Sequence, residues 1–172
     1  MTKDELRQNL FTERTNVYAI LDGASIADLR IRLYESSPPH YCLFRGELPP
    51  DVQEAAPYLV GLIDGSPFTE WMLDESFGNH WGIYAHSKHS ITEMRRHFRG
   101  LINVHDEAGN PMIFRYYDPR VLTSFLPTCD AEQLQTFFGK IDIYFAEDRD
   151  GTMLSSFTFE NNELRSRNIG KE

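Results

Sequence analysis

The sequence of 172 residues is poor in cysteine and has no long apolar run. Cys42 and Cys129 are too few for a disulfide framework, and their spacing matches no zinc or redox motif, so we expect two reduced thiols. No segment approaches the roughly 20 apolar residues of a membrane-spanning helix. Residues 1–16 also lack the apolar stretch of a signal peptide. These absences predict a cytoplasmic protein without membrane insertion.

Positive charge is scarce, since 17 lysines and arginines stand against 26 aspartates and glutamates and leave a formal net charge of −9. Nucleic-acid binding depends mainly on the neutralisation of phosphates, so no nucleic-acid partner is expected. Arg95, Arg96 and Arg99 do cluster, but their spacing is typical of the solvated face of a helix. The acidic balance instead suits a partner protein with a basic patch.

Common catalytic motifs are missing as well. The sequence has neither the G-x-S-x-G elbow of the α/β hydrolases nor the G-K-[ST] of a phosphate-binding loop. His80, His86, His89 and Glu93 are near one another in the sequence, but H-x-x-H at a strand end is a poor spacing for metal ligands. We therefore expect no catalytic residues, no metal site and no cofactor.

The sequence does contain a regular alternation of short apolar runs and amphipathic stretches. The expected strands cover residues 17–21, 41–44, 57–63, 81–87 and 112–117, and the expected helices include 25–36, 67–77, 90–102, 118–126 and 130–139. This order predicts an α/β fold, with a central mixed β-sheet flanked by helices. Residues 140–172 alternate between apolar and polar and contain turn signals, so this β-rich tail is expected to form an antiparallel hairpin or meander.

Two of the expected helices begin with a sequence typical of a capping box. Ser90 is followed three residues later by Glu93, and Ser25 is followed in the same way by Asp28. In such a box the first side chain accepts a hydrogen bond from the third helical N–H, and the acidic side chain accepts one in return. We therefore expect helices to start directly after Ser25 and Ser90.

The stretch FRYYDPRVL, residues 114–122, crowds charged side chains and aromatic rings around a proline. If strand 112–117 runs into it, successive side chains point to opposite faces of the sheet, and Arg115 projects from an otherwise buried strand. An unpaired buried charge is costly, so Arg115 should have a carboxylate partner or an exit to water. Asp22, at the end of the first expected strand, is the first candidate partner, and Asp118 is the local alternative.

Asp118 and Pro119 have the residue types of a helix start. Aspartate is a preferred N-cap, and proline is favoured at the first helical position because its missing N–H is not needed there. Arg120 follows in the first turn, where a cation is unfavourable by about 0.3–1 kcal/mol. Some carboxylate, on this chain or on a partner, should therefore hold Arg120. This structural interpretation of the motif is favoured over a catalytic one.

Several blocks together resemble one protein family. VYAILDGA, APYLVGLI, WGIYAHS, ITEMRRHFRGLINV and above all IFRYYDPRVL are similar to the adaptor, or chaperone, domain of bacterial type VI secretion, a domain of unknown function often encoded beside VgrG spike proteins and toxic effectors. The resemblance covers about residues 17–139 of what we expect to be a single adaptor domain, 1–172. Many members carry a further C-terminal helical lobe, in whose place this chain has its short β-rich tail.

The resemblance implies a non-enzymatic adaptor in the cytoplasm of a Gram-negative bacterium. Such an adaptor binds a cognate type VI effector protein and helps to load it onto the VgrG spike. The resemblance carries over a family motif, structural or partner-binding, that consists of Asp22, Phe114, Arg115, Tyr116, Tyr117, Asp118, Pro119 and Arg120. Exposed aromatics dominate many interfaces, so the further candidate partner contacts are Tyr58, Trp71, Phe77 and Trp81.

Two alternatives stay open from the sequence. A small α/β enzyme would place its site near Asp22, Arg115 and Asp118, and these side chains would then line an open pocket with perturbed ionisation. An acidic immunity protein would be equally small. Neutralisation of a cognate toxin in a growth assay would distinguish it from an adaptor.

Overall fold

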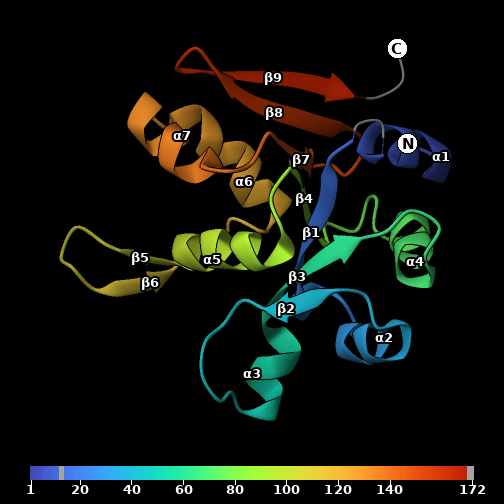
Figure 1. Ribbon diagram of the computed structural model, residues 1–172. Coiled ribbons are helices and arrows are strands. Elements are labelled where there is room, and N and C mark those ends of the chain that lie inside the picture. Colours follow the sequence, from blue (N-terminus) through green and yellow to red (C-terminus); the bar gives the residue numbers. More distant parts are fainter. Residues whose placement is uncertain (12–13, 170–172) are drawn as a thin grey trace.

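A seven-stranded sheet runs through the molecule, and helices cover both of its faces (Figure 1). The computed structural model describes residues 1–11 and 14–169. The strands lie in the order β2-β3-β1-β4-β7-β8-β9, and β5 and β6 form a separate two-stranded hairpin. The strand bounds are β1 Asn16–Asp22, β2 His40–Cys42, β3 Pro57–Leu62, β4 Gly82–Ser87, β5 Asn103–His105, β6 Pro111–Ile113, β7 Ile143–Glu147, β8 Leu154–Glu160 and β9 Glu163–Ile169. The short apolar runs of the sequence thus become the central strands.

The helices form two layers. One face of the sheet carries α5 Ile91–Ile102, α6 Pro119–Phe125 and α7 Ala131–Phe138, and the other carries α1 Lys3–Leu10, α2 Leu29–Ser36 and α4 Pro67–Glu75 (Figure 1). The remaining short elements are α3 Pro50–Ala55 and the 3₁₀ turns η1 Gly23–Ser25 and η2 Leu126–Thr128. Tyr18 and Ile20 of β1 pack under the α5 layer, whereas Val17, Ala19 and Leu21 pack under the α1 layer. Within the described ranges, no helix combines the length and apolar character needed to cross a membrane.

The α/β class, the flanking helices and the C-terminal meander β7–β9 confirm the prediction from the sequence, but the sheet itself is not mixed. Every strand pair among the described residues is antiparallel. The position of β1 explains the difference. β3 and β4 run in the same direction and are joined through α4, as in a βαβ unit, but β1 lies between them and pairs with both. The unit is split, so its two strands do not become neighbours.

The expected strand 112–117 is shorter than its apolar pattern suggested. β6 ends at Ile113 and pairs with β5 in a hairpin that projects beyond the end of α5 (Figure 1). Residues 114–118 form a loop, so the expected alternation of their side chains between two faces of a sheet is wrong. Their apolar side chains are covered by tertiary packing, which a loop achieves as well as a strand.

The two expected capping boxes have different outcomes. Ser90 and Glu93 cap α5 reciprocally, as predicted. Asp28 instead adopts a left-handed backbone with φ of 59° and makes no side-chain cap, and α2 starts only at Leu29. The competing partner is Asp22, whose carboxylate accepts hydrogen bonds from the Ser25 hydroxyl at 3.0 Å and from the backbone N–H two residues after Asp22. Ser25 is therefore part of the turn η1 and does not begin a helix.

Candidate functional site

The family motif is a loop that leads from the β5–β6 hairpin into α6. The Phe114 N–H donates to the carbonyl of Ile102 at 2.7 Å, which fastens the start of the loop to the end of α5. The Asp118 N–H donates to the carbonyl of Arg115 at 3.0 Å and closes a turn just before α6. The backbone of the motif is thus fixed at both ends.

The two tyrosines of the motif are core residues. Tyr116 is fully buried, its hydroxyl donates to the carbonyl of Phe98 at 2.9 Å, and its ring stacks on that of Phe98 with 6.0 Å between centroids. Tyr117 is buried beside it. Burial raises the pKa of Tyr116 well above its ordinary value and raises that of Tyr117 as well. Both phenols are therefore neutral packing groups, and they anchor the loop beneath α5.

Arg115 pairs with Asp22, as the sequence predicted. Its Nη2 lies 2.6 Å from Oδ2 of Asp22, at the end of β1; the carboxylate side chain is 3% exposed and the arginine side chain 50%. Partial burial alone would lower the pKa of Arg115, but the hydrogen bond and charge of Asp22 raise it. The arginine therefore has both outcomes that were expected as alternatives, a carboxylate partner and an exit to water.

Asp118 and Arg120 form a second ion pair. Asp118 is the N-cap of α6, accepts from the Arg120 N–H at 3.0 Å and receives the guanidinium in a fork, with Nε at 2.9 Å and Nη2 at 2.8 Å. Burial would raise the pKa of Asp118, but these hydrogen bonds and the charge of Arg120 lower it below its usual value. Pro119 occupies the first helical position. The expected carboxylate for Arg120 is thus its own N-cap.

The two pairs determine what this arrangement can do chemically. Each carboxylate is nearly buried and accepts from one backbone N–H and from an arginine, whereas the arginine side chains are 50% and 52% exposed. A carboxylate held in this way stabilises a turn. The half-exposed guanidinium groups of Arg115 and Arg120 keep donors free to contact a partner.

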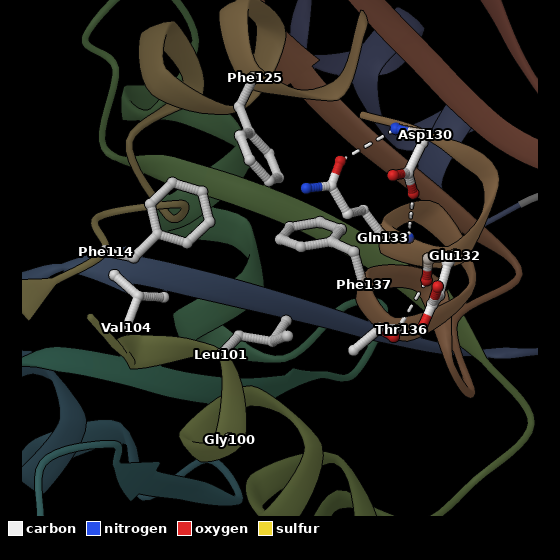
Figure 2. Close-up of a pocket in the computed structure, with 10 residues that line it drawn as sticks. All are labelled: Gly100, Leu101, Val104, Phe114, Phe125, Asp130, Glu132, Gln133, Thr136 and Phe137. Carbon is white, nitrogen blue, oxygen red and sulfur yellow. Dashed lines mark hydrogen bonds between the residues drawn. The ribbon is translucent and has the colours of Figure 1, made fainter. Parts of the chain in front are cut away.

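Phe114, the first residue of the motif, borders an apolar recess of about 350 Å³ that opens between α5, the hairpin, α6 and α7 (Figure 2). Figure 2 shows three phenylalanine rings around this space, with centroids of Phe114 and Phe125 4.6 Å apart and of Phe125 and Phe137 5.6 Å apart. The lining residues are Gly100, Leu101, Val104, Phe114, Phe125, Asp130, Glu132, Gln133, Thr136 and Phe137. The recess is therefore walled by rings and has polar groups only along α7.

Sequence reasoning missed the recess because its apolar residues on α5, α6 and α7 have the spacing of ordinary core positions. Gly100 was the available signal. It lies inside α5, where glycine costs roughly 0.5–1 kcal/mol relative to alanine. A Cβ at position 100 would meet nothing within 4 Å. Packing within the chain therefore does not require this glycine.

The other candidate partner contacts lie elsewhere. Tyr58 is buried in β3, and its hydroxyl donates to the carbonyl of Gln53 at 3.0 Å. Trp71, Phe77 and Trp81 are half-buried against the core on the α1 side of the sheet, opposite the motif. Trp81 meets the motif through its backbone, since its carbonyl accepts from the Asp22 N–H at 2.8 Å, but the rings of Trp71, Phe77 and Trp81 pack on the other face of the sheet from Tyr116 and Tyr117.

The arginine cluster on α5 is less solvated than expected. Arg99 donates to the carbonyls of Cys42 at 2.8 Å and Phe44 at 3.3 Å, and the Arg95 guanidinium lies 4.4 Å from the ring centroid of Tyr41. Burial lowers the pKa of Arg99. The cause is the position of α5 beside the end of the edge strand β2, where Arg99 binds one carbonyl of the strand and one of the residues that follow it. Only Arg96 of the three is exposed.

The histidines His86 and His89 are held by contacts within the protein. Cys42 and Cys129 are both free thiols. A ring nitrogen of His86 lies 2.8 Å from the carbonyl of Leu10, and His89 pairs with Glu93 at 3.1 Å. Across residues 1–11 and 14–169, no group of three or more His, Cys, Asp or Glu side chains could hold a metal ion.

Comparison with known proteins identifies one family. No curated protein and no solved structure matches the chain significantly. Residues 17–136 match a domain of unknown function, DUF4123, and this range includes α5, the motif, nearly all of α7 and every residue that lines the recess except Phe137. Because the match covers more than half of the sequence, the protein belongs to the DUF4123 family.

Proposed function

We propose that the protein is a non-enzymatic cytoplasmic adaptor that binds a type VI secretion effector and helps to load it onto the VgrG spike of a Gram-negative bacterium. Membership of the DUF4123 family supports this function through the resemblance described above. The mechanism is stoichiometric binding, in which the adaptor shields part of the effector and presents it to the spike.

The arrangement of the motif carries the proposal. Two buried carboxylates fix the loop and hold Arg115 and Arg120 half-exposed, while Phe114 borders an apolar recess on the same side of the sheet. Arginine and aromatic side chains are the residue types enriched in protein interfaces. A rigid loop that displays them loses little entropy on binding.

The same contacts argue for an adaptor over a small enzyme. A general base needs a lone pair free to take a proton and a pKa near the working pH. The Asp22 and Asp118 carboxylates are already bound by backbone N–H groups and arginines, and the pKa of Asp118 is lowered. This region is therefore better suited to positioning than to proton transfer.

Co-purification tests the proposal. The tagged protein is co-expressed with the effector and the VgrG protein whose genes are expected beside its own, and the complex is purified at moderate salt. The adaptor function predicts that the effector is retained in a defined ratio and that the spike joins the complex. Retention of neither protein contradicts it. A growth assay with the effector alone supplies the control, because an immunity protein would abolish toxicity without any spike.

A further inference from the structure

We propose that the recess between α5 and α7 is the seat of a short amphipathic helix of the effector, whose apolar face enters the recess and whose basic residues face α7. This inference rests on the proposed function and adds to it the part of the surface that grips the cargo and the chemistry of the gripped segment. It follows from three independent observations: an unfilled apolar space, an unexplained glycine and a one-sided distribution of charge.

The space has the size and lining of a binding site. Its volume of about 350 Å³ lies at the lower end of ligand clefts, which span roughly 300–1,000 Å³, and therefore suits a few apolar side chains. The apolar surface continues onto the hairpin, because Val104 lines the recess and its cross-strand partner Met112, on the same face, is 49% exposed. Together they offer an elongated strip, as a helix requires.

Gly100 indicates that the occupant approaches the backbone of α5 closely. The residue is in a helix, without the positive φ that favours glycine, and a Cβ there would project into open space. Apart from the helix itself, no described residue lies within 4 Å of such a Cβ, so we attribute the missing side chain to an occupant from outside the chain. A glycine that lowers helix stability is useful where another backbone must come near.

The charges around the recess indicate which residues the occupant carries and which of its sides faces α7. Glu132 and Asp130 lie along the α7 side of the recess, and no lysine or arginine is among its lining residues. On α5, Arg96 lies one turn before Gly100 and on the same face of the helix, but it does not line the recess. Basic residues of the occupant are thus favoured beside α7, in agreement with the net charge of −9.

The test uses the full chain, its recess variants and two kinds of probe. Gly100→Phe fills the recess from α5, and Thr136→Trp fills it from α7 should the first variant fold poorly. Thr92→Phe is the matched control, because it places the same ring on α5 outside the recess. Gly100→Ala tests the close approach itself, since its methyl group enters the space that the occupant's backbone would use. The probes are the purified effector and two synthetic helical peptides with one apolar face in common, one with lysines and one with glutamates on the polar face.

Calorimetric titration measures the affinities. We expect the lysine peptide to bind about tenfold or more tightly than the glutamate peptide, and Gly100→Phe to weaken the lysine peptide and the effector by about tenfold or more. The Thr92→Phe control should stay within about twofold of the wild type, whereas Gly100→Ala should weaken both ligands, by less than Gly100→Phe does. Charge reversal by Glu132→Lys should remove the preference for lysine.

Four other results would overturn the inference, and they separate it from the adaptor function. If the effector binds the wild type and both filled variants equally, the adaptor function stands but the recess is not the site that binds the effector. If the glutamate peptide binds as well as the lysine peptide, the proposed charge selectivity is wrong. If light scattering finds a dimer that Gly100→Phe dissociates, a second copy of this chain covers the recess. If neither peptide binds, the recess does not hold a helix. Conversely, if the lysine peptide binds in the recess but the effector does not bind at all, the adaptor function fails while the recess stands as a helix-binding site.

Discussion

Arg115 and Asp22 are 93 positions apart in the chain, and their side chains meet at 2.6 Å across the end of β1. The contact joins the loop part of the family motif, residues 114–120, to the one motif residue on the first strand of the family match. Because Asp22 also holds the turn η1, one buried carboxylate sets the position of two loops. The pair is therefore a structural ion pair, in which Asp22 is buried and Arg115 is half-exposed.

Loss of the Arg115–Asp22 ion pair should lower the stability of the fold. Arg115→Ala leaves the Asp22 carboxylate buried without its cation, which should cost about 1–2 kcal/mol of unfolding free energy, since water screens the exposed side of the arginine. Urea denaturation measures the loss. Arg149→Ala, in an exposed turn, is the control and should change stability by less than about 0.5 kcal/mol. Unchanged stability of Arg115→Ala together with lost effector binding would show that Arg115 is a recognition residue.

Two substitutions of Asp118 should distinguish the stabilisation by the N-cap of α6 from the stabilisation by the ion pair with Arg120. Asp118→Ala removes both and should cost about 1–2 kcal/mol, whereas Asp118→Asn keeps a capping acceptor and should cost less. The lowered pKa of Asp118 means that its carboxylate stabilises the folded state above the unfolded pKa of about 3.9 and loses this effect as the pH falls through the folded pKa. We therefore expect the free energy of unfolding to be higher for the wild type than for Asp118→Asn at pH 7, and this difference to become smaller in acid. Chemical denaturation at both pH values measures it. A constant difference would contradict the ionic contribution.

His97 should make the fold sensitive to mild acid. Burial lowers its pKa, and Nε2 lies 3.0 Å from the carbonyl of Phe137. Protons then bind the unfolded chain more readily, so unfolding free energy falls as the pH drops below the unfolded value of about 6.5. His97→Gln retains a hydrogen-bond donor without titrating and should flatten the slope between about pH 7 and pH 5. Identical slopes in both proteins would exclude His97 as the cause.

Two glycines should respond to alanine in opposite directions. A Cβ at Gly82 would lie 2.1 Å from the carbonyl oxygen of Ile20 on the neighbouring strand, so Gly82→Ala should destabilise the protein by about 1–3 kcal/mol or more. Gly100→Ala enters open space in a helix and should stabilise it by about 0.5–1 kcal/mol. Thermal unfolding of the two variants measures both. A destabilised Gly100→Ala would mean that the glycine is required by the fold itself.

Local signals predicted much of this structure from the sequence. The Ser90–Glu93 box, the Asp118–Pro119 helix start and the Arg115–Asp22 pair all follow from short-range stereochemistry or from the cost of burying a charge. The Ser25–Asp28 box failed because the Asp22 carboxylate, three residues before Ser25, accepts the hydrogen bond of the same hydroxyl.

Long-range packing explains the remaining differences. The apolar run 112–117 looks like a strand, yet residues 114–117 form a loop in which the two tyrosines are buried and Arg115 is exposed. Periodicity cannot show which element covers a buried side chain. The antiparallel sheet depends on the insertion of β1 between β3 and β4, which no local pattern encodes. The recess is formed by the tertiary packing of α5, α6, α7 and the hairpin, and the sequence analysis did not identify it.

The central claim is that this chain escorts an effector to the secretion spike. Its most direct test is to measure, by quantitative mass spectrometry of the medium, how much of the neighbouring effector is exported by a strain that lacks this protein. The account predicts that export of that effector is lost while other substrates still leave, and that the wild-type chain restores it. Normal export of the effector from the deletion strain would contradict the account.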